Sequence, residues 1–115
     1  MREILTRINE WWERGEVPPT MVPRTRRFVI SEIVPLLEER RITGIIGPRR
    51  TGKTTLMLQI MDLLIKERRL NPRNILFLPC DDILLKGRKD LIGEAITVYF
   101  EEILKRDYRS ERVYI

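Results

Sequence analysis

Residues 44–57 read GIIGPRRTGKTTLM and contain the pattern that most restricts how this chain folds. Within this stretch, residues 47–54 match G-x-x-x-x-G-K-[ST] at every fixed position. The two glycines allow backbone conformations that a Cβ disfavours, so successive N–H groups point inward and form a concave anion site. The sequence therefore predicts a phosphate-binding loop of the Walker A type, with a strand before it and a helix after it.

The residues predicted to hold a nucleotide follow one another without a gap. The helix after the loop presents unpaired N–H groups and its positive dipole end to the phosphates. Lys53 is a mobile cation for the β- and γ-phosphates, and the Thr54 hydroxyl suits Mg²⁺, which prefers oxygen ligands at short range. Arg49 and Arg50 fill variable positions, and the sequence does not show what they contact. The predicted cofactor-binding set is Gly47, Pro48, Arg49, Arg50, Thr51, Gly52, Lys53, Thr54 and Thr55, with Thr54 as the Mg²⁺ ligand.

Hydrophobic periodicity divides the rest of the chain into helices and short strands. Apolar side chains at helical spacing predict helices over residues 3–14, 26–40, 53–69 and 89–105, with Pro35 kinking or shortening the second. The stretches ITGII (42–46), ILFLP (75–79) and RVYI (from 112) are interpreted as buried strands. This order predicts an α/β fold, an incomplete three-layer αβα P-loop NTPase domain over residues 26–115 with about three parallel strands. Residues 1–25 are predicted to form an N-terminal amphipathic helix and a proline-rich connector.

Charge and composition narrow the partners and the compartment. The chain of 115 residues carries 22 Lys and Arg against 17 Asp and Glu, a net charge of +5. This balance favours anionic partners, but a solvated Arg-rich surface is the preferred explanation over a dedicated nucleic-acid face, so nucleic acid stays an open partner. Cys80 is the only cysteine and His is absent, which excludes an internal disulfide and a Cys/His zinc cluster. No signal-peptide region and no apolar run near ~18 residues occur, so we expect a cytoplasmic protein that does not bind membranes.

Four segments occur in a recognisable order: WWERGEVPP (11–19), RTRRFVISEI (24–33), GPRRTGKTT (47–55) and DLIGEAITVYFEEIL (90–104). Together they resemble the archaeal-type P-loop ATPases of the AAA+ and related class. The resemblance implies ATP as the nucleotide, Mg²⁺ as its metal and ATPase activity, that is NTP hydrolysis, in the complete protein. Arg27 and Phe28 precede the second helix, where such ATPases often line the adenine pocket.

The resemblance also implies a feature that this chain lacks. In that family the third strand carries the Walker B motif, apolar residues followed by Asp-Glu, whereas RVYI ends at Ile115. We expect a fragment or truncated product of a larger ATPase that binds ATP and alone hydrolyses little or none of it. The family's strand order, 5-1-4-3-2, would leave ITGII without either neighbour. We therefore expect marginal stability, a further C-terminal portion or partner chain that completes the sheet, self-association through exposed edges, or a different strand order.

Two acidic residues after the second predicted strand leave an alternative open. Asp81 and Asp82 either cap a turn or position a metal ion or water. With the second role the chain would be a small phosphotransferase, and a third hypothesis is a nucleotide-gated interaction module without turnover. Trp11 and Trp12 are expected to pack on the core rather than stack on bases. The loop does not reveal which process the nucleotide drives.

Overall fold

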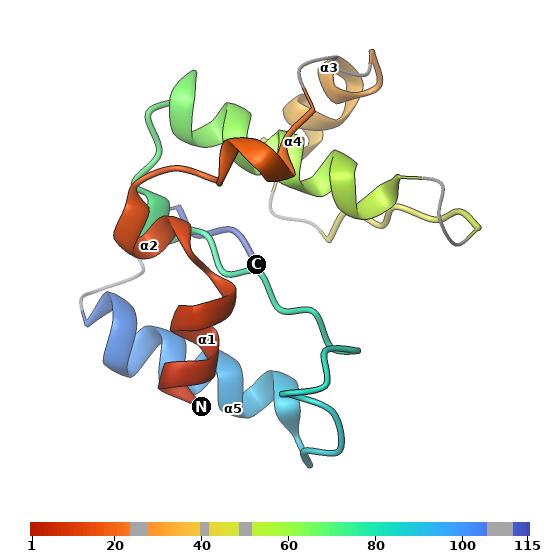
Figure 1. Cartoon of the computed structure of the whole chain (residues 1–115). Helices are drawn as coiled ribbons and strands as arrows, with labels where there is room; N and C mark the ends of the chain where they lie inside the picture. The colour runs from red at the N-terminus through yellow and green to blue at the C-terminus, as the bar shows by residue number, and fades with distance from the viewer. Residues whose placement is uncertain (24–27, 40–41, 49–51, 106–111) are drawn as a thin grey trace. The chain divides into compact units, whose positions relative to one another are not determined.

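The computed structural model describes residues 1–23, 28–39, 42–48, 52–105 and 112–115 (Figure 1). These residues form two compact units. One unit combines Met1–Glu16 with Leu70–Ile115, and the other is Val17–Arg69. The predicted division into residues 1–25 and 26–115 stays a prediction, because compact units need not coincide with domains defined by sequence.

Two short helices replace the single helix predicted over residues 3–14. The first, α1 (Arg2–Ile8), and the second, α2 (Trp11–Arg14), are separated at Asn9 and Glu10. The predicted end near Gly15 is confirmed: Gly15 has φ 83°, a left-handed conformation that favours glycine, and its N–H donates to the Trp11 carbonyl at 2.9 Å.

The C-terminal part of the same unit is also helical. Its elements are the 3₁₀ turn η3 (Pro72–Asn74), the helix α5 (Leu91–Val98) and the π-helical segment η4 (Tyr99–Leu104). The helix predicted over residues 89–105 is thereby confirmed as two consecutive segments. Helix α1 lies against α5 and η4, and α2 lies against η3 (Figure 1). The apolar residues buried in this unit are Leu5, Trp11, Trp12, Ile75, Leu76, Leu85, Ala95, Tyr99, Ile103 and Leu104.

The unit Val17–Arg69 carries the helix that follows the predicted loop. Its elements are η1 (Pro19–Met21), α3 (Ile30–Ile33), the 3₁₀ segment η2 (Val34–Glu38) and α4 (Lys53–Lys66). Pro35 lies at the start of η2, where the α-helix ends, as expected of a residue without a backbone N–H. Helix α4 begins at Lys53 as predicted. It buries a broad band made up of Leu56, Leu58, Gln59, Ile60, Met61, Leu63 and Leu64.

The predicted three-layer αβα arrangement with about three parallel strands is wrong. Within the described ranges the chain forms helices and no strand, apart from an isolated parallel bridge between Ile75 and Tyr114. Residues 42–46 were expected to be a buried strand, yet the side chains of Ile42 and Ile46 are 100% and 98% exposed. A strand exists only through hydrogen bonds to its neighbours, and residues 42–48 are assigned to no ladder.

Side chains replace a neighbouring strand along residues 75–77. The Ile75 carbonyl accepts the indole N–H of Trp12 at 2.7 Å and that of Trp11 at 3.2 Å. The Asn9 side chain pairs with both backbone groups of Phe77, accepting from its N–H at 2.7 Å and donating to its carbonyl at 3.1 Å. The opposite edge meets Tyr114, which bonds the Leu76 N–H and the Asn74 carbonyl at 2.9 Å each. These backbone groups are therefore satisfied without a sheet.

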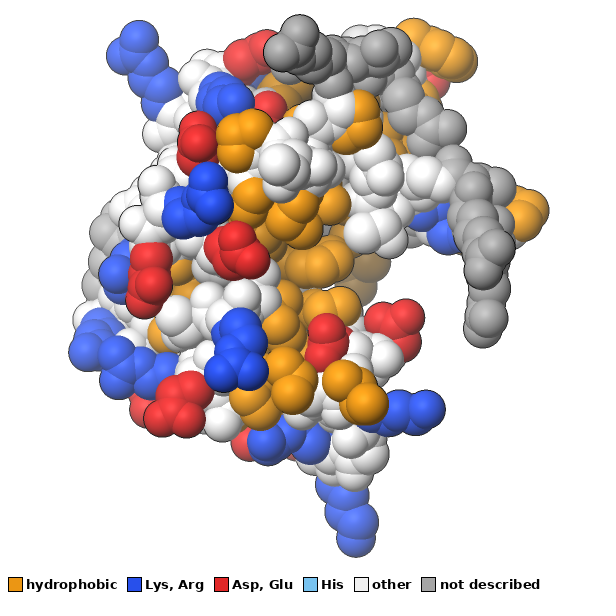
Figure 2. Space-filling model, viewed as in Figure 1, with side chains coloured by type: hydrophobic (Ala, Val, Ile, Leu, Met, Phe, Trp, Pro, Cys, Tyr) orange, Lys and Arg blue, Asp and Glu red, His pale blue; other side chains and the backbone are white. Residues whose placement is uncertain are grey.

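Charges of both signs share the surface. On the face shown in Figure 2, Lys and Arg side chains are interspersed with Asp and Glu, and apolar side chains reach the surface between them. Large apolar side chains that are more than half exposed include Phe28, Ile42, Ile46, Ile83, Ile92 and Ile115. Among the described residues, none of the helices has both the length and the apolar character needed to cross a membrane.

Replacing Asn9 tests whether its side chain holds the segment 75–77 in place. Asn9→Ala leaves the N–H and carbonyl of Phe77 without partners, so we expect unfolding of this unit to become easier by about 1–3 kcal/mol. Denaturant titration followed by the fluorescence of the buried tryptophans reports the change. Glu10→Ala, at the exposed neighbouring position, is the control. An equal effect of the two substitutions would contradict this role of Asn9.

Candidate phosphate-binding loop

The structure describes six of the nine residues predicted to bind a nucleotide. Gly47, Pro48, Gly52, Lys53, Thr54 and Thr55 lie within the described ranges, whereas Arg49, Arg50 and Thr51 lie outside them. All six belong to the unit Val17–Arg69.

Gly52 forms the junction between the loop and helix α4. It is the N-cap of the helix, with φ 87° and ψ 21°, and its carbonyl accepts the first helical hydrogen bond from the Leu56 N–H at 2.9 Å. This left-handed conformation is the physical reason for glycine at the sixth position of the motif. Since glycine has no side chain, the N-cap residue itself makes no side-chain hydrogen bond to the first N–H groups of α4.

The Lys53 ammonium lies over the start of the loop. Its Nζ donates to the Gly47 carbonyl and to the Pro48 carbonyl, both at 2.6 Å. The side chain therefore turns back from the first turn of α4 and places a positive charge beside the loop backbone. Both carbonyls are neutral acceptors, so an anion would be a stronger partner for the same ammonium.

Thr54 and Thr55 occupy the next two helical positions. Thr54 is exposed, and Thr55 is half-buried. In the described part of the chain neither hydroxyl has a hydrogen-bond partner. A free hydroxyl oxygen at the start of a helix is a hard donor, and such donors suit Mg²⁺. The residues present thus fit both groups that the sequence predicts, a phosphate and its metal ion.

The two acidic residues after the second predicted strand have different surroundings. Asp82 stabilises a turn: its carboxylate accepts the Leu84 N–H at 2.8 Å, and its carbonyl accepts the N–H groups of Leu85 and Lys86 at 3.0 and 2.9 Å. The turn-capping interpretation is confirmed for Asp82. Asp81 is exposed, and a role in metal or water positioning stays a prediction for it.

The aromatic residues discussed in the sequence analysis differ in how far they are buried. Trp11 and Trp12 are buried, with 1% and 6% of their surface exposed, so their predicted packing role is confirmed. Trp12 stacks on Tyr99, with ring centroids 5.6 Å apart. Phe28 is 83% exposed and Arg27 lies outside the described ranges, so the adenine-lining role of these two residues stays a prediction.

Sequence reasoning missed Asn9, whose amide satisfies a backbone 68 residues away. No local pattern marks such a residue. The only signal was a side-chain amide two residues before a pair of tryptophans, in a predicted helix with mostly charged and apolar side chains.

Comparison with known proteins identifies the family. A family model described as an AAA domain matches residues 39–115, more than half of the chain. The chain belongs to the AAA domain family. Searches of curated proteins and of solved structures found no significant match. The matched region of the AAA domain includes the whole loop, and membership in the family indicates a nucleotide-binding, ATPase-like function.

The substitution Gly52→Ala tests whether nucleotide binding by the AAA domain needs the left-handed backbone conformation of Gly52. In Gly52→Ala the left-handed backbone costs roughly 1–2 kcal/mol, so we expect nucleotide affinity to fall by about tenfold. Calorimetric titration measures the affinity. Gly44→Ala is a matched control in the same stretch, because a Cβ built at Gly44 meets nothing within 4 Å. Unchanged affinity in Gly52→Ala would show that the loop does not need this conformation.

Proposed function

We propose that this AAA domain binds ATP together with Mg²⁺ through residues 47–55, as the nucleotide-binding part of an ATPase. The observation that carries the proposal is the junction of loop and helix. A left-handed glycine starts α4, and the Lys53 ammonium beside it lies 2.6 Å from two loop carbonyls. The match to the Walker A pattern at every fixed position supports the same conclusion.

Lys53 and the first turn of α4 act on the phosphates. The N–H groups of a helix start and the positive end of its dipole favour an anion at this place. Exchange of the carbonyl partners of Lys53 for phosphate oxygens replaces neutral hydrogen bonds with charge-assisted ones, which are about twice as strong. Lys53 therefore contributes binding energy and orients the terminal phosphates.

Thr54 is the residue that we propose as the Mg²⁺ ligand. When bound, Mg²⁺ neutralises charge on the phosphates, and it commonly keeps several waters and takes few protein ligands. One exposed hydroxyl next to Lys53 meets that requirement.

Slow turnover by this chain follows from the chemistry of the loop. Hydrolysis needs a group that positions the attacking water as well as cations that stabilise the transition state. Residues 47–55 contain no Asp or Glu, and the Asp82 carboxylate accepts a backbone N–H in its own turn. We propose binding of ATP with little or no hydrolysis by the chain alone.

Replacing Lys53 tests the binding site. Because Lys53→Ala removes a charge-assisted contact of about 1.5–3 kcal/mol, we expect the affinity for Mg²⁺-ATP to fall by roughly tenfold to a hundredfold. Calorimetric titration measures it. Lys66→Ala is the matched control, since Lys66 ends the same helix and pairs there with Asp62 at 3.2 Å. Equal affinities in the wild type and Lys53→Ala would reject the assignment of the loop.

Replacing the two aspartates separates an ATP-binding domain from a phosphotransferase. Asn can also accept the Leu84 N–H, so we expect Asp82→Asn to keep the turn, the ATP affinity and the low turnover of the wild type. We expect the same of Asp81→Asn. Release of phosphate and transfer to small acceptors are measured side by side. A substantial wild-type activity that either substitution abolishes would favour the phosphotransferase.

A further inference from the structure

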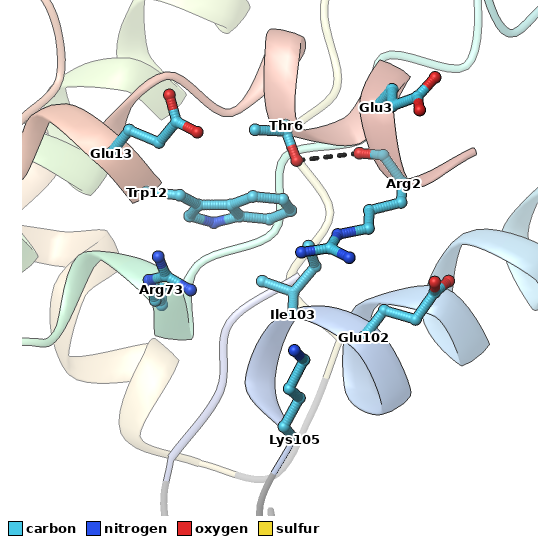
Figure 3. Close-up of a pocket in the computed structure, with 9 residues that line it drawn as sticks. All are labelled: Arg2, Glu3, Thr6, Trp12, Glu13, Arg73, Glu102, Ile103 and Lys105. Atoms are coloured by element: carbon cyan, nitrogen blue, oxygen red, sulfur yellow. Dashed lines mark hydrogen bonds between the residues drawn. The ribbon is translucent and has the colours of Figure 1, made fainter.

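A pocket lies in the unit made of Met1–Glu16 and Leu70–Ile115. The pocket is open on one side and has a volume of about 420 Å³, within the range of small-molecule sites (Figure 3). Its walls come from α1, α2, η3 and the end of η4, segments that are distant in the sequence. The lining residues are Arg2, Glu3, Thr6, Trp12, Glu13, Arg73, Glu102, Ile103 and Lys105.

The positively and negatively charged side chains of this pocket point in different directions. In Figure 3 the Arg2 guanidinium and the Lys105 ammonium point toward the space below the Trp12 ring, and Arg73 borders the same space. The carboxylates of the three glutamates, Glu3, Glu13 and Glu102, point toward the rim and away from this space. Among the described residues, none of the three cations has a carboxylate partner within ion-pair distance, although three carboxylates line the same pocket.

The backbone at the pocket has an unusual geometry. Segment η4 is a π-helix, a rare conformation that is frequent at functional sites. It ends at Leu104, and the next residue, Lys105, has a φ of 56°, which is uncommon for a residue with a Cβ. The Lys105 N–H donates to the Phe100 carbonyl at 3.1 Å. The Tyr99 hydroxyl donates to the Arg73 carbonyl at 2.5 Å, which ties η4 to η3. The same segment therefore holds the backbone of both Arg73 and Lys105.

We propose that this pocket binds a small organic phosphate. Arg2, Arg73 and Lys105 surround the phosphate group, and the organic part lies against Trp12 and Ile103. Arginine presents a planar set of donors that matches phosphate oxygens, and a dianion gains more from three cations than a monoanion does. The acidic rim repels a long polyanion, so a nucleic-acid backbone is disfavoured.

This site is distinct from the loop of the AAA domain. Its lining residues belong to a different compact unit, and its cations are side chains alone, whereas the loop combines the Lys53 ammonium with the N–H groups of a helix start. The proposal goes beyond the proposed function and does not depend on it. A binding test in a chain that carries Lys53→Ala in the loop distinguishes phosphate binding in the pocket from nucleotide binding in the loop.

Calorimetric titration of phenyl phosphate into the Lys53→Ala chain tests the pocket. We expect phenyl phosphate to bind this chain saturably at one site. When Arg2→Ala and Arg73→Ala are both added to it, we expect the affinity to fall by at least about tenfold. The matched control is Arg7→Ala with Arg14→Ala, which removes the same charge from exposed positions outside the pocket. In the control we expect a change below about twofold. Inorganic phosphate and benzoate should each bind more weakly than phenyl phosphate, because one lacks the ring and the other the second charge.

Three outcomes would overturn the proposal. They are the absence of saturable phenyl phosphate binding, an equal loss in the control pair, and unchanged binding in the Arg2 and Arg73 pair. Tighter binding of benzoate would overturn the choice of phosphate. Far-UV circular dichroism checks that each variant folds. Should the double variant unfold, Lys105→Gln provides an independent test, because it alone must also weaken phenyl phosphate binding.

Discussion

The backbone of residues 75–77 must have its hydrogen bonds satisfied, and the way this happens organises its whole unit. The segment is apolar and its first two residues, Ile75 and Leu76, are buried. Buried backbone groups without partners cost free energy comparable to lost hydrogen bonds. Asn9 supplies an acceptor and a donor to Phe77, and two indole N–H groups share the Ile75 carbonyl. Four hydrogen bonds therefore connect the N-terminal helices to this segment.

This arrangement explains why one compact unit contains both ends of the sequence. The partners of residues 75–77 are Asn9, Trp11 and Trp12 on one edge and Tyr114 on the other. The stacking of Trp12 on Tyr99 then connects η4 to the same core. Since indole N–H groups are donors only, the tryptophans suit the buried Ile75 carbonyl, which needs donors, whereas the Asn9 amide suits Phe77, whose N–H and carbonyl both need partners.

The helices could be predicted from the sequence and the strands could not, for one physical reason. Local signals decide where a helix begins and ends: Lys53 follows the loop glycine, Pro35 ends an α-helix, and Gly15 adopts the left-handed conformation that stops α2. A strand needs a partner elsewhere in the chain. Apolar runs at 42–46 and 75–79 predict strands only if neighbouring strands exist. At 75–77 the partners on one edge are side chains, and Asn9 lies 68 residues from Phe77, beyond the reach of a local pattern.

The two candidate sites also differ in whether local sequence signals or contacts between distant residues form them. The loop could be predicted because its chemistry lies in consecutive residues, where Gly52 sets the backbone and Lys53 supplies the charge. The pocket could not, because Arg2, Arg73 and Lys105 come from three elements and lie near one another only after α1, η3 and η4 pack together. Binding there depends on that packing, so a ligand of the pocket stabilises the unit that forms it. A ligand of the loop instead contacts consecutive residues, 47–55, at the start of α4.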